Sequence, residues 1–279
     1  MFSSKRKFAL VAITSLIISF AITFAHAEGL DSFKGMEGKI DIAGGTAHIP
    51  VMKGAAKLVM QSNPSIRITV AGGGSGVGVQ KVGEGLVDIG NAGRPLTAKE
   101  AEKYGLESFP FAIDGVAPII NPENKVDGLD ASKIREIFSG AITNWKEVGG
   151  ADAEIHLYTR DEASGTRAVF WKKLLNKGEI GQTANVVSSN GSMKVAVSND
   201  PGAIGYMSIG HLDGSVKALA VDGVTPDQES AVSGKYPVVR KLFMNTKGAP
   251  SPLVKAFIDF ILSPDGAKLI RESGYLPLK

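Results

Sequence analysis

Short apolar runs that end in glycine alternate along this chain with longer runs whose apolar residues recur at helical spacing. A short apolar run closed by glycine is typical of a buried strand, whereas apolar residues at every third or fourth position indicate an amphipathic helix. The first part of the chain therefore predicts three strand–helix units: Lys39–Gly45 with His48–Ser62, Ile66–Gly74 with Val77–Gly85, and Leu86–Gly93 with Thr97–Gly105. Regular alternation of this kind predicts an α/β architecture.

The same alternation continues to the end of the chain. It predicts helices over Ala131–Gly140 and Ser192–Asp200 and strands over Glu154–Arg160 and Ala203–Ile209. A further helix is predicted to begin shortly after the strand that ends at Arg160. A last helix over Ser251–Ser273 begins with Ser-Pro, a good start signal, and is interrupted at a second Ser-Pro. No repeat of solenoid length is present.

The N-terminal segment predicts a secretory signal peptide. Three cations, an apolar run over Phe8–Phe24 and the closing Ala25-His26-Ala27 follow one another in the order of such a peptide. The alternative is an uncleaved membrane anchor, but serines and threonines dilute the run and no stop-transfer charge cluster follows. We expect cleavage after Ala27. The chain contains no cysteine, which excludes a lipid-anchored cysteine and disulfides, so the sequence predicts a periplasmic protein.

Removal of residues 1–27 changes the charge of the chain. The net charge of +3 comes from Lys5, Arg6 and Lys7; the 31 basic residues less these three leave 28, which balance the 28 acidic residues. A nucleic-acid-binding protein normally has a basic excess, so nucleic acid is not an expected partner. The 279 residues less the first 27 leave 252, enough for one large or two medium domains.

Polar loops follow four of the predicted strands. These loops contain Gly44–Ala47, Gly72–Gly76, Asp88, and Arg160 with Ser164–Thr166. Ligands of open α/β sheets bind beyond the carboxyl ends of the strands. Three of the loops lead into a helix with serine or threonine at its start, where backbone N–H groups and the helix dipole both favour an anion. The loops therefore predict a site for one small anion.

Each of these residues also has an ordinary structural interpretation. Thr46, Ser75 and Ser164 could be simple helix N-caps, and the glycines could serve only in turns. Arg160 could form a surface ion pair with Glu162, and the carboxylate of Asp88 could cap a turn. What favours the anion site is the recurrence of the same donor-rich loop at equivalent positions. Arg94 and Arg167 flank these loops, and we expect them to be rim or ion-pair residues.

Five stretches together carry a family resemblance. They are AGGGSGVG, VDIGNAGRPL, IREIFSGAITNWKEVGG, RDEASGTR and GAIGYMSIG. With them the chain resembles, over Lys39–Lys279, the periplasmic phosphate-binding proteins of ABC-type phosphate importers, which belong to the type II periplasmic-binding-protein superfamily. The resemblance implies that this chain captures inorganic phosphate for the permease subunits of such an importer. It also implies a monomer without a cofactor.

The resemblance also implies a fold and a set of ligand residues. The fold has two α/β lobes joined by two crossing strands, which we place near Asp114–Ala117 and Tyr206–Ile209; lobe 1 is then residues 28–115 with 208–279, and lobe 2 is residues 116–207. Phosphate would lie in the cleft between the lobes. The family's phosphate contacts fall on these residues of the chain: Thr46, Ala47, Ser75, Asp88, Arg160, Ser164, Gly165 and Thr166, with Glu162 holding Arg160 in place.

Asp88 would set the specificity of such a site. Phosphate carries a proton at neutral pH that a carboxylate can accept, whereas sulfate carries none and would be repelled. Asp88 therefore predicts phosphate over sulfate, and a binding protein for sulfate, molybdate or tungstate is the alternative.

An enzyme is the other class to consider. Ser75 and Ser164 lie in glycine-rich turns, but neither is in a G-x-S-x-G motif, and the run Gly72–Gly78 fits neither nucleotide-binding pattern. His48, His156 and His211 are widely spaced and form no metal-ligand pattern. The sequence therefore predicts a binding protein without catalytic residues or a metal.

Overall fold

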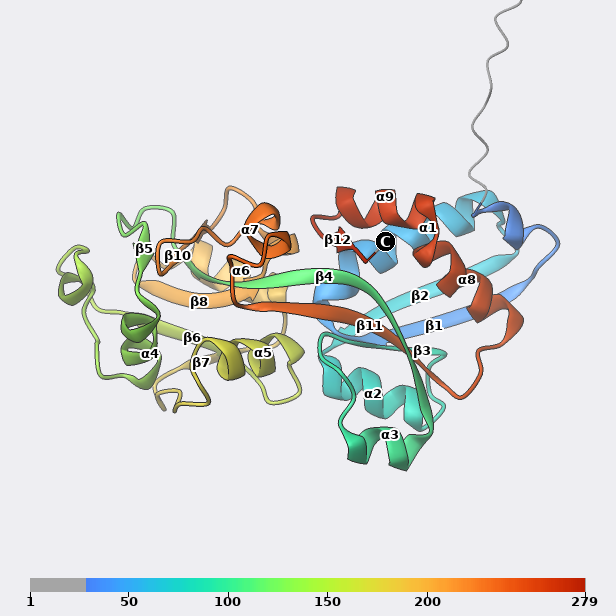
Figure 1. Cartoon of the computed structure of the whole chain (residues 1–279), viewed down its shortest axis with the longest axis horizontal. Coiled ribbons are helices and arrows are strands. Elements are labelled where there is room, and N and C mark those ends of the chain that lie inside the picture. Colours follow the sequence, from blue (N-terminus) through green and yellow to red (C-terminus); the bar gives the residue numbers. More distant parts are fainter. Residues whose placement is uncertain (1–28, 279) are drawn as a thin grey trace, which may run out of the picture.

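Two long strands, β4 (Leu106–Ile120) and β11 (Val239–Lys247), run side by side between the two halves of the molecule (Figure 1). The computed structural model describes residues 29–278, so the predicted signal peptide lies outside the described residues. Within that described range, no helix has the length and apolar character needed to cross a membrane.

The other strands and the helices alternate as the hydrophobic pattern predicts. The strands are β1 (Gly38–Gly44), β2 (Ile66–Gly73), β3 (Ile89–Ala92), β5 (Gly128–Leu129), β6 (His156–Arg160), β7 (Asn185–Val187), β8 (Ala203–Ser208), β9 (Lys217–Ala218), β10 (Ala220–Val221) and β12 (Leu276–Pro277). The α-helices are α1 (Ile49–Ser62), α2 (Ser75–Gly83), α3 (Ala98–Tyr104), α4 (Ala131–Ser139), α5 (Gly165–Lys173), α6 (Asn190–Ser198), α7 (Gln228–Val232), α8 (Pro252–Leu262) and α9 (Pro264–Glu272). The mixed α/β fold is thus confirmed.

Strand pairing continues through both halves in the order β2-β1-β3-β11-β4-β8-β6-β7. β1 is parallel to β2 and β3, and β6 is parallel to β7 and β8, whereas β4 and β11 are antiparallel to each other. Parallel pairing brings the carboxyl ends of neighbouring strands to one edge. The loops that follow β1, β2 and β3 are therefore neighbours, as a ligand site at this edge requires.

Each half has its own hydrophobic core. In the half that contains β1–β3, which we call the first lobe, the core includes Val51 of α1, Phe111 of β4 and Phe257 of α8. In the other half, the second lobe, Phe170 of α5 stacks on Tyr206 of β8, with ring centroids 4.2 Å apart. Two separate cores joined by extended strands are the arrangement of a two-lobed protein that can close on a ligand.

The structure corrects one predicted boundary between the lobes. The chain does not return to the first lobe near Tyr206–Ile209, because Val216, Leu219 and Tyr236 are buried in the core of the second lobe. The segment GAIGYMSIG is largely apolar, as a crossing strand would be, but β8 is buried in the second lobe, where it pairs with β4 and β6. β11 makes the return instead. Within the described residues, we propose 29–115 with 239–278 as the first lobe and 116–238 as the second.

The predicted break in the last helix is confirmed. α8 ends at Leu262 and α9 begins at Pro264. Proline has no backbone N–H and is tolerated in the first turn of a helix, where that N–H would have no partner. The hydroxyl of Ser263 accepts a hydrogen bond from the N–H of Gly266 at 3.2 Å, so this serine caps α9.

Candidate functional site

A small cavity lies where the two lobes meet, at the carboxyl ends of the strands. It is lined by Gly45, Thr46, Ala47, His48, Gly74, Ser75, Gly93, Arg160, Ser164, Gly165, Thr166 and Arg240. Seven of the eight predicted ligand residues are in this set. The loops that the sequence singled out therefore do converge on one place.

The first lobe contributes two hydroxyl groups, both buried. Thr46 begins a single 3-10 turn, Thr46–His48, that leads into α1, and Ser75 is the first residue of α2. The hydroxyl of Ser75 accepts a hydrogen bond from the N–H of Gly93 at 2.9 Å and can still donate one of its own. Gly44 lets the two loops approach, because its φ of 125° favours glycine and a Cβ there would collide with backbone atoms of α2 and β3.

The second lobe contributes the start of α5. Ser164 is its N-cap, and the serine hydroxyl accepts a hydrogen bond from the N–H of Arg167 at 3.1 Å. Capping and anion binding therefore do not compete at this position, because the cap uses the N–H of Arg167 and leaves those of Gly165 and Thr166 free to donate. Ser164, Gly165 and Thr166 are all buried at the cavity.

Arg160, the last residue of β6, places a guanidinium in the cavity. Only 2% of the residue is exposed. One nitrogen, Nη2, donates to the carbonyl of Ser188 at 2.9 Å, whereas Nε and Nη1 are buried and bond to none of the described residues. Burial lowers the pKa of Arg160, and the nearby carboxylate of Asp161 opposes this. A buried cation with two unused donors is costly unless an anion accepts from them.

The two lobes touch each other around the cavity. The N–H of Gly76 donates to the carbonyl of Ala163 at 2.9 Å. The side-chain amide of Asn190, at the start of α6, donates to the hydroxyl oxygen of Thr46 at 3.0 Å. These bonds connect the ligand loops of one lobe with those of the other, so the structure is a closed form. Asn190 is not marked by any motif of the sequence.

Asp88 is not brought to the cavity, and its predicted contact with the anion is corrected. It precedes β3, whereas the cavity lies beyond the other end of that strand, at Gly93. Five residues of extended chain span about 16 Å. The Asp88 carboxylate instead accepts a hydrogen bond from the N–H of Asp41 in β1 at 2.7 Å, so it ties its loop to a neighbouring strand and does not cap its own turn.

We therefore expect Asp88→Asn to leave anion binding unchanged. The amide oxygen of asparagine can still accept the N–H of Asp41, and the residue is too far away to contact a ligand in the cavity. Calorimetric titration with phosphate and with sulfate should give affinities within about twofold of wild type, because a substitution this far from the ligand has little effect on its contacts. A change in the ratio of the two affinities would contradict this placement.

The residues expected to support Arg160 also differ. Glu162 is exposed and makes no ion pair with Arg160 among the described residues; the carbonyl of Ser188 and the charge of Asp161 take that place. Arg94, which was expected to be a rim or an ion-pair residue, forms an ion pair with Glu100 at 2.7 Å. This contact lowers the pKa of Glu100 to about 2. Arg167 does not line the cavity.

Five cavity residues were not predicted as ligands, and two of them, His48 and Arg240, have polar side chains. His48 is fully buried, and this burial lowers its pKa to about 3, so the ring is neutral at physiological pH. Arg240 of β11 forms a buried ion pair with Asp114 of β4, with 2.7 Å between Nη2 and Oδ2. A sequence signal exists for one member of this pair: Asp114 is the single charge in the apolar run FPFAIDGVAPII, whereas Arg240 is followed by a second cation, Lys241, in YPVVRKLFM.

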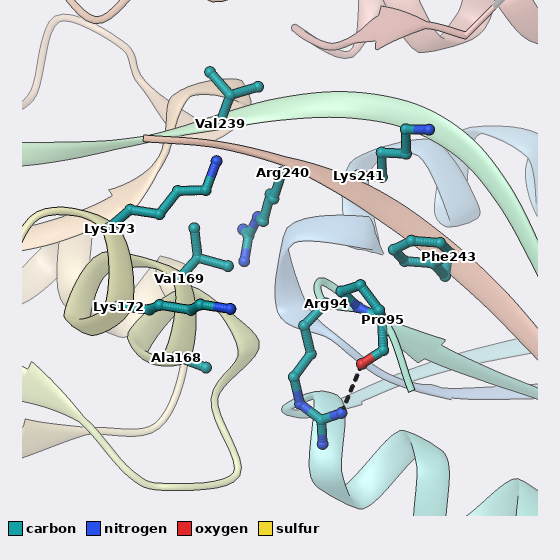
Figure 2. Close-up of a pocket in the computed structure, with 10 residues that line it drawn as sticks. All are labelled: Arg94, Pro95, Ala168, Val169, Lys172, Lys173, Val239, Arg240, Lys241 and Phe243. Carbon is teal, nitrogen blue, oxygen red and sulfur yellow. Dashed lines mark hydrogen bonds between the residues drawn. The ribbon is translucent and has the colours of Figure 1, made fainter. Parts of the chain in front are cut away.

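A larger pocket, of about 470 Å³, opens beside the cavity and shares Arg240 with it. Figure 2 shows Arg240 descending from β11 between α5 and the Arg94–Pro95 segment, with Lys172 extending into the same space from α5. Lys173 and Lys241 also line this pocket. An approaching anion would thus meet positive charge before it reaches the cavity.

The comparisons with known proteins agree on the family that this chain is similar to. A family model described as a PBP superfamily domain matches residues 27–265. The chain is 35% identical to the phosphate-binding protein PstS of Bacillus subtilis, over 98% of this chain and 95% of that protein.

Two solved structures are also similar. A putative phosphate ABC transporter substrate-binding protein from Clostridium perfringens, solved with bound phosphate, is 33% identical and superposes with a TM-score of 0.82 over 87% of this chain and all of the other. An ABC-type phosphate transport receptor from Vibrio cholerae is 34% identical, with a TM-score of 0.69 over 85% of this chain and 99% of the other. The likeness therefore extends over both lobes.

Proposed function

We propose that this chain, which belongs to the PstS family of phosphate-binding proteins within the periplasmic-binding-protein superfamily, captures inorganic phosphate between its two lobes and delivers it to an ABC-type importer. The Bacillus subtilis relative that carries this name is similar over 98% of the chain, and the Clostridium perfringens protein solved with bound phosphate over 87% of it. The family consists of substrate-binding proteins and not of enzymes.

One observation in the site supports phosphate capture above all. The guanidinium of Arg160 is buried with two nitrogens that bond to no described residue, in a cavity where helix N-termini and hydroxyl groups converge. A desolvated tetrahedral anion needs a donor for nearly every oxygen, because each unsatisfied polar group costs several kcal/mol. We assign the contacts with the anion to Thr46, Ala47, Ser75, Arg160, Ser164, Gly165 and Thr166.

The closed form explains how binding could be signalled to an importer. Phosphate held by Ser75 of the first lobe and Arg160 of the second would favour closure, because its contacts with both lobes exist only when they meet. We propose that the membrane subunits recognise this closed shape. We also propose that the protein acts as a monomer in the periplasm after cleavage behind Ala27, without a cofactor.

Phosphate should raise the melting temperature of protein that has been stripped of bound anion. Ligand at 100 times its dissociation constant stabilises the folded state by about 2.7 kcal/mol. For a chain of this size that corresponds to a rise of about 5–10 °C. A melting temperature that does not respond to millimolar phosphate would contradict the proposed function.

Calorimetric titration of the stripped protein with a panel of oxyanions tests the choice of ligand. We expect one phosphate per chain. A chain that bound sulfate, molybdate or tungstate tightly and phosphate weakly would instead be a binding protein for that anion. If the same preparation also hydrolysed a phosphate ester and released phosphate, the protein would be an enzyme.

A further inference from the structure

Arg240 lies at the junction between the two lobes, and two of its three guanidinium nitrogens have partners. Nε donates to Oδ2 of Asp114 at 2.8 Å, and Nη2 lies 2.7 Å from the same oxygen in the ion pair and donates to the hydroxyl of Thr166 at 3.1 Å. The third nitrogen, Nη1, makes no such bond and would lie 2.7 Å from a Cβ on Gly93, at the wall of the cavity. The absence of a side chain at Gly93 therefore leaves Nη1 open to the cavity.

The cavity has two cations and no carboxylate. None of its twelve lining residues, all of them in the described part of the chain, is acidic, and its charged members are Arg160 and Arg240. Asp114 lies behind Arg240, where its side chain is fully buried and also accepts from the hydroxyl of Ser208 at 2.8 Å. An anion in the cavity would face both guanidinium groups, and Arg240 would separate it from Asp114.

We propose that Arg240 is a second cationic ligand of the anion, and that this site selects its ligand by charge and not by a carboxylate that accepts a proton. This inference rests on the proposed function and specifies its selectivity. The preferred ligand is then a tetrahedral dianion: phosphate in its singly protonated form, with sulfate tolerated. A site built around a required hydrogen-bond partner rejects the analogue that lacks it by about 10⁴- to 10⁵-fold.

The discrimination available in this cavity is smaller. The remaining acceptors for the phosphate proton are neutral: the hydroxyl groups and the uncharged ring of His48. Hydroxyl groups can turn to donate to sulfate instead, so they do not repel it. One neutral hydrogen bond corresponds to about a tenfold to hundredfold difference in affinity. We therefore expect phosphate to bind no more than about 100 times more tightly than sulfate.

The phosphate affinity should also rise between pH 6 and pH 8, as the monoanion becomes the dianion, whereas the sulfate affinity should stay level. Burial lowers the pKa of His48 to about 3 and that of His211 to about 4, so neither ring ionises in this range. Burial raises the pKa of the phenols Tyr236 and Tyr275 beyond it. The other charged groups around Arg240 and the cavity are Asp114 on β4, Arg94 after β3, Arg160 with the neighbouring Asp161 at the end of β6, Lys172 and Lys173 on α5, and Lys241 on β11.

The test is calorimetric titration of wild type, Arg240→Lys, Gly93→Asp and Gly93→Asn with phosphate and with sulfate. Arg240→Lys keeps a cation beside Asp114 but removes the planar fork, so both affinities should fall by about tenfold to hundredfold with their ratio kept. Gly93→Asp adds a carboxylate beside Nη1 and should widen the ratio of phosphate to sulfate affinity by about tenfold to hundredfold. Gly93→Asn, of the same size but uncharged, should leave the ratio within about threefold of wild type.

Two results would overturn the proposal. One is a wild-type protein that binds phosphate but prefers it to sulfate by more than about 10⁴-fold; the other is an Arg240→Lys protein that binds both anions as wild type does. If Arg240→Lys does not melt cooperatively, the ratio of phosphate to sulfate affinity in wild type and in the two Gly93 variants still tests the proposal. Wild type that binds neither anion would instead contradict the proposed function itself.

Discussion

Replacement of Arg160 by alanine is expected to weaken phosphate binding by about 30-fold to more than 1,000-fold. Loss of one partner from a buried, hydrogen-bonded charge pair costs about 2–5 kcal/mol, and each 1.4 kcal/mol is a factor of ten in affinity. Two nitrogens of the buried Arg160 guanidinium bond to no described residue and can donate to the anion. Thr46→Ala removes a single hydroxyl contact and should cost less, about tenfold.

Arg135→Ala is the matched control for this prediction. Arg135 lies in the same lobe and, like Arg160, donates to a backbone carbonyl, that of Leu174 at 3.2 Å, but it does not line the cavity. We expect its phosphate affinity to equal that of wild type, while thermal melting reports the loss of structure common to both variants. Equal phosphate affinities for the Arg160 and Arg135 variants would show that Arg160 does not contact the anion.

The hydrophobic pattern of the sequence predicted the strand–helix alternation and the loops, because both are local properties of the chain. Ser75 and Ser164 could be identified from their position between a strand and a helix. Asp88 precedes β3, whereas the loop at the cavity follows β3, and the sequence did not show where this short strand begins and ends. A shift of a few residues in strand position moves a side chain by more than 10 Å.

Long-range pairing was beyond a local reading of the sequence. Asp114 and Arg240 are 126 positions apart, and their contact depends on the antiparallel register that sets Arg240 opposite Asp114. The same register makes β11 the second connection between the lobes, which the sequence assigned to the segment around β8. The residues that approach the cavity from β11 could therefore be found only after the strand order was known.

Gly165→Ala should weaken phosphate binding by about five- to 150-fold without destabilising the protein that has no ligand. A Cβ on Gly165, in the second lobe, would overlap the side chain of Ser75 in the first lobe. Overpacking of this kind costs about 1–3 kcal/mol, occasionally more. The collision exists only when the lobes meet, because Gly165 is a normal position in the first turn of α5. The substitution should therefore act against closure and not against folding.

Gly191→Ala provides the matched control, because Gly191 is also in the first turn of a helix of the second lobe. It is exposed, and its Cβ would meet only the hydroxyl of Ser189, at an ordinary 3.7 Å. Small-angle scattering with and without phosphate should show that the Gly191 variant contracts as wild type does, whereas the Gly165 variant contracts only at higher phosphate concentrations. The melting temperature without phosphate should be the same for all three proteins. If Gly165→Ala bound phosphate with wild-type affinity, the contact between Gly165 and Ser75 would not belong to the form that holds the ligand, and capture would require a closure different from the one in this structure.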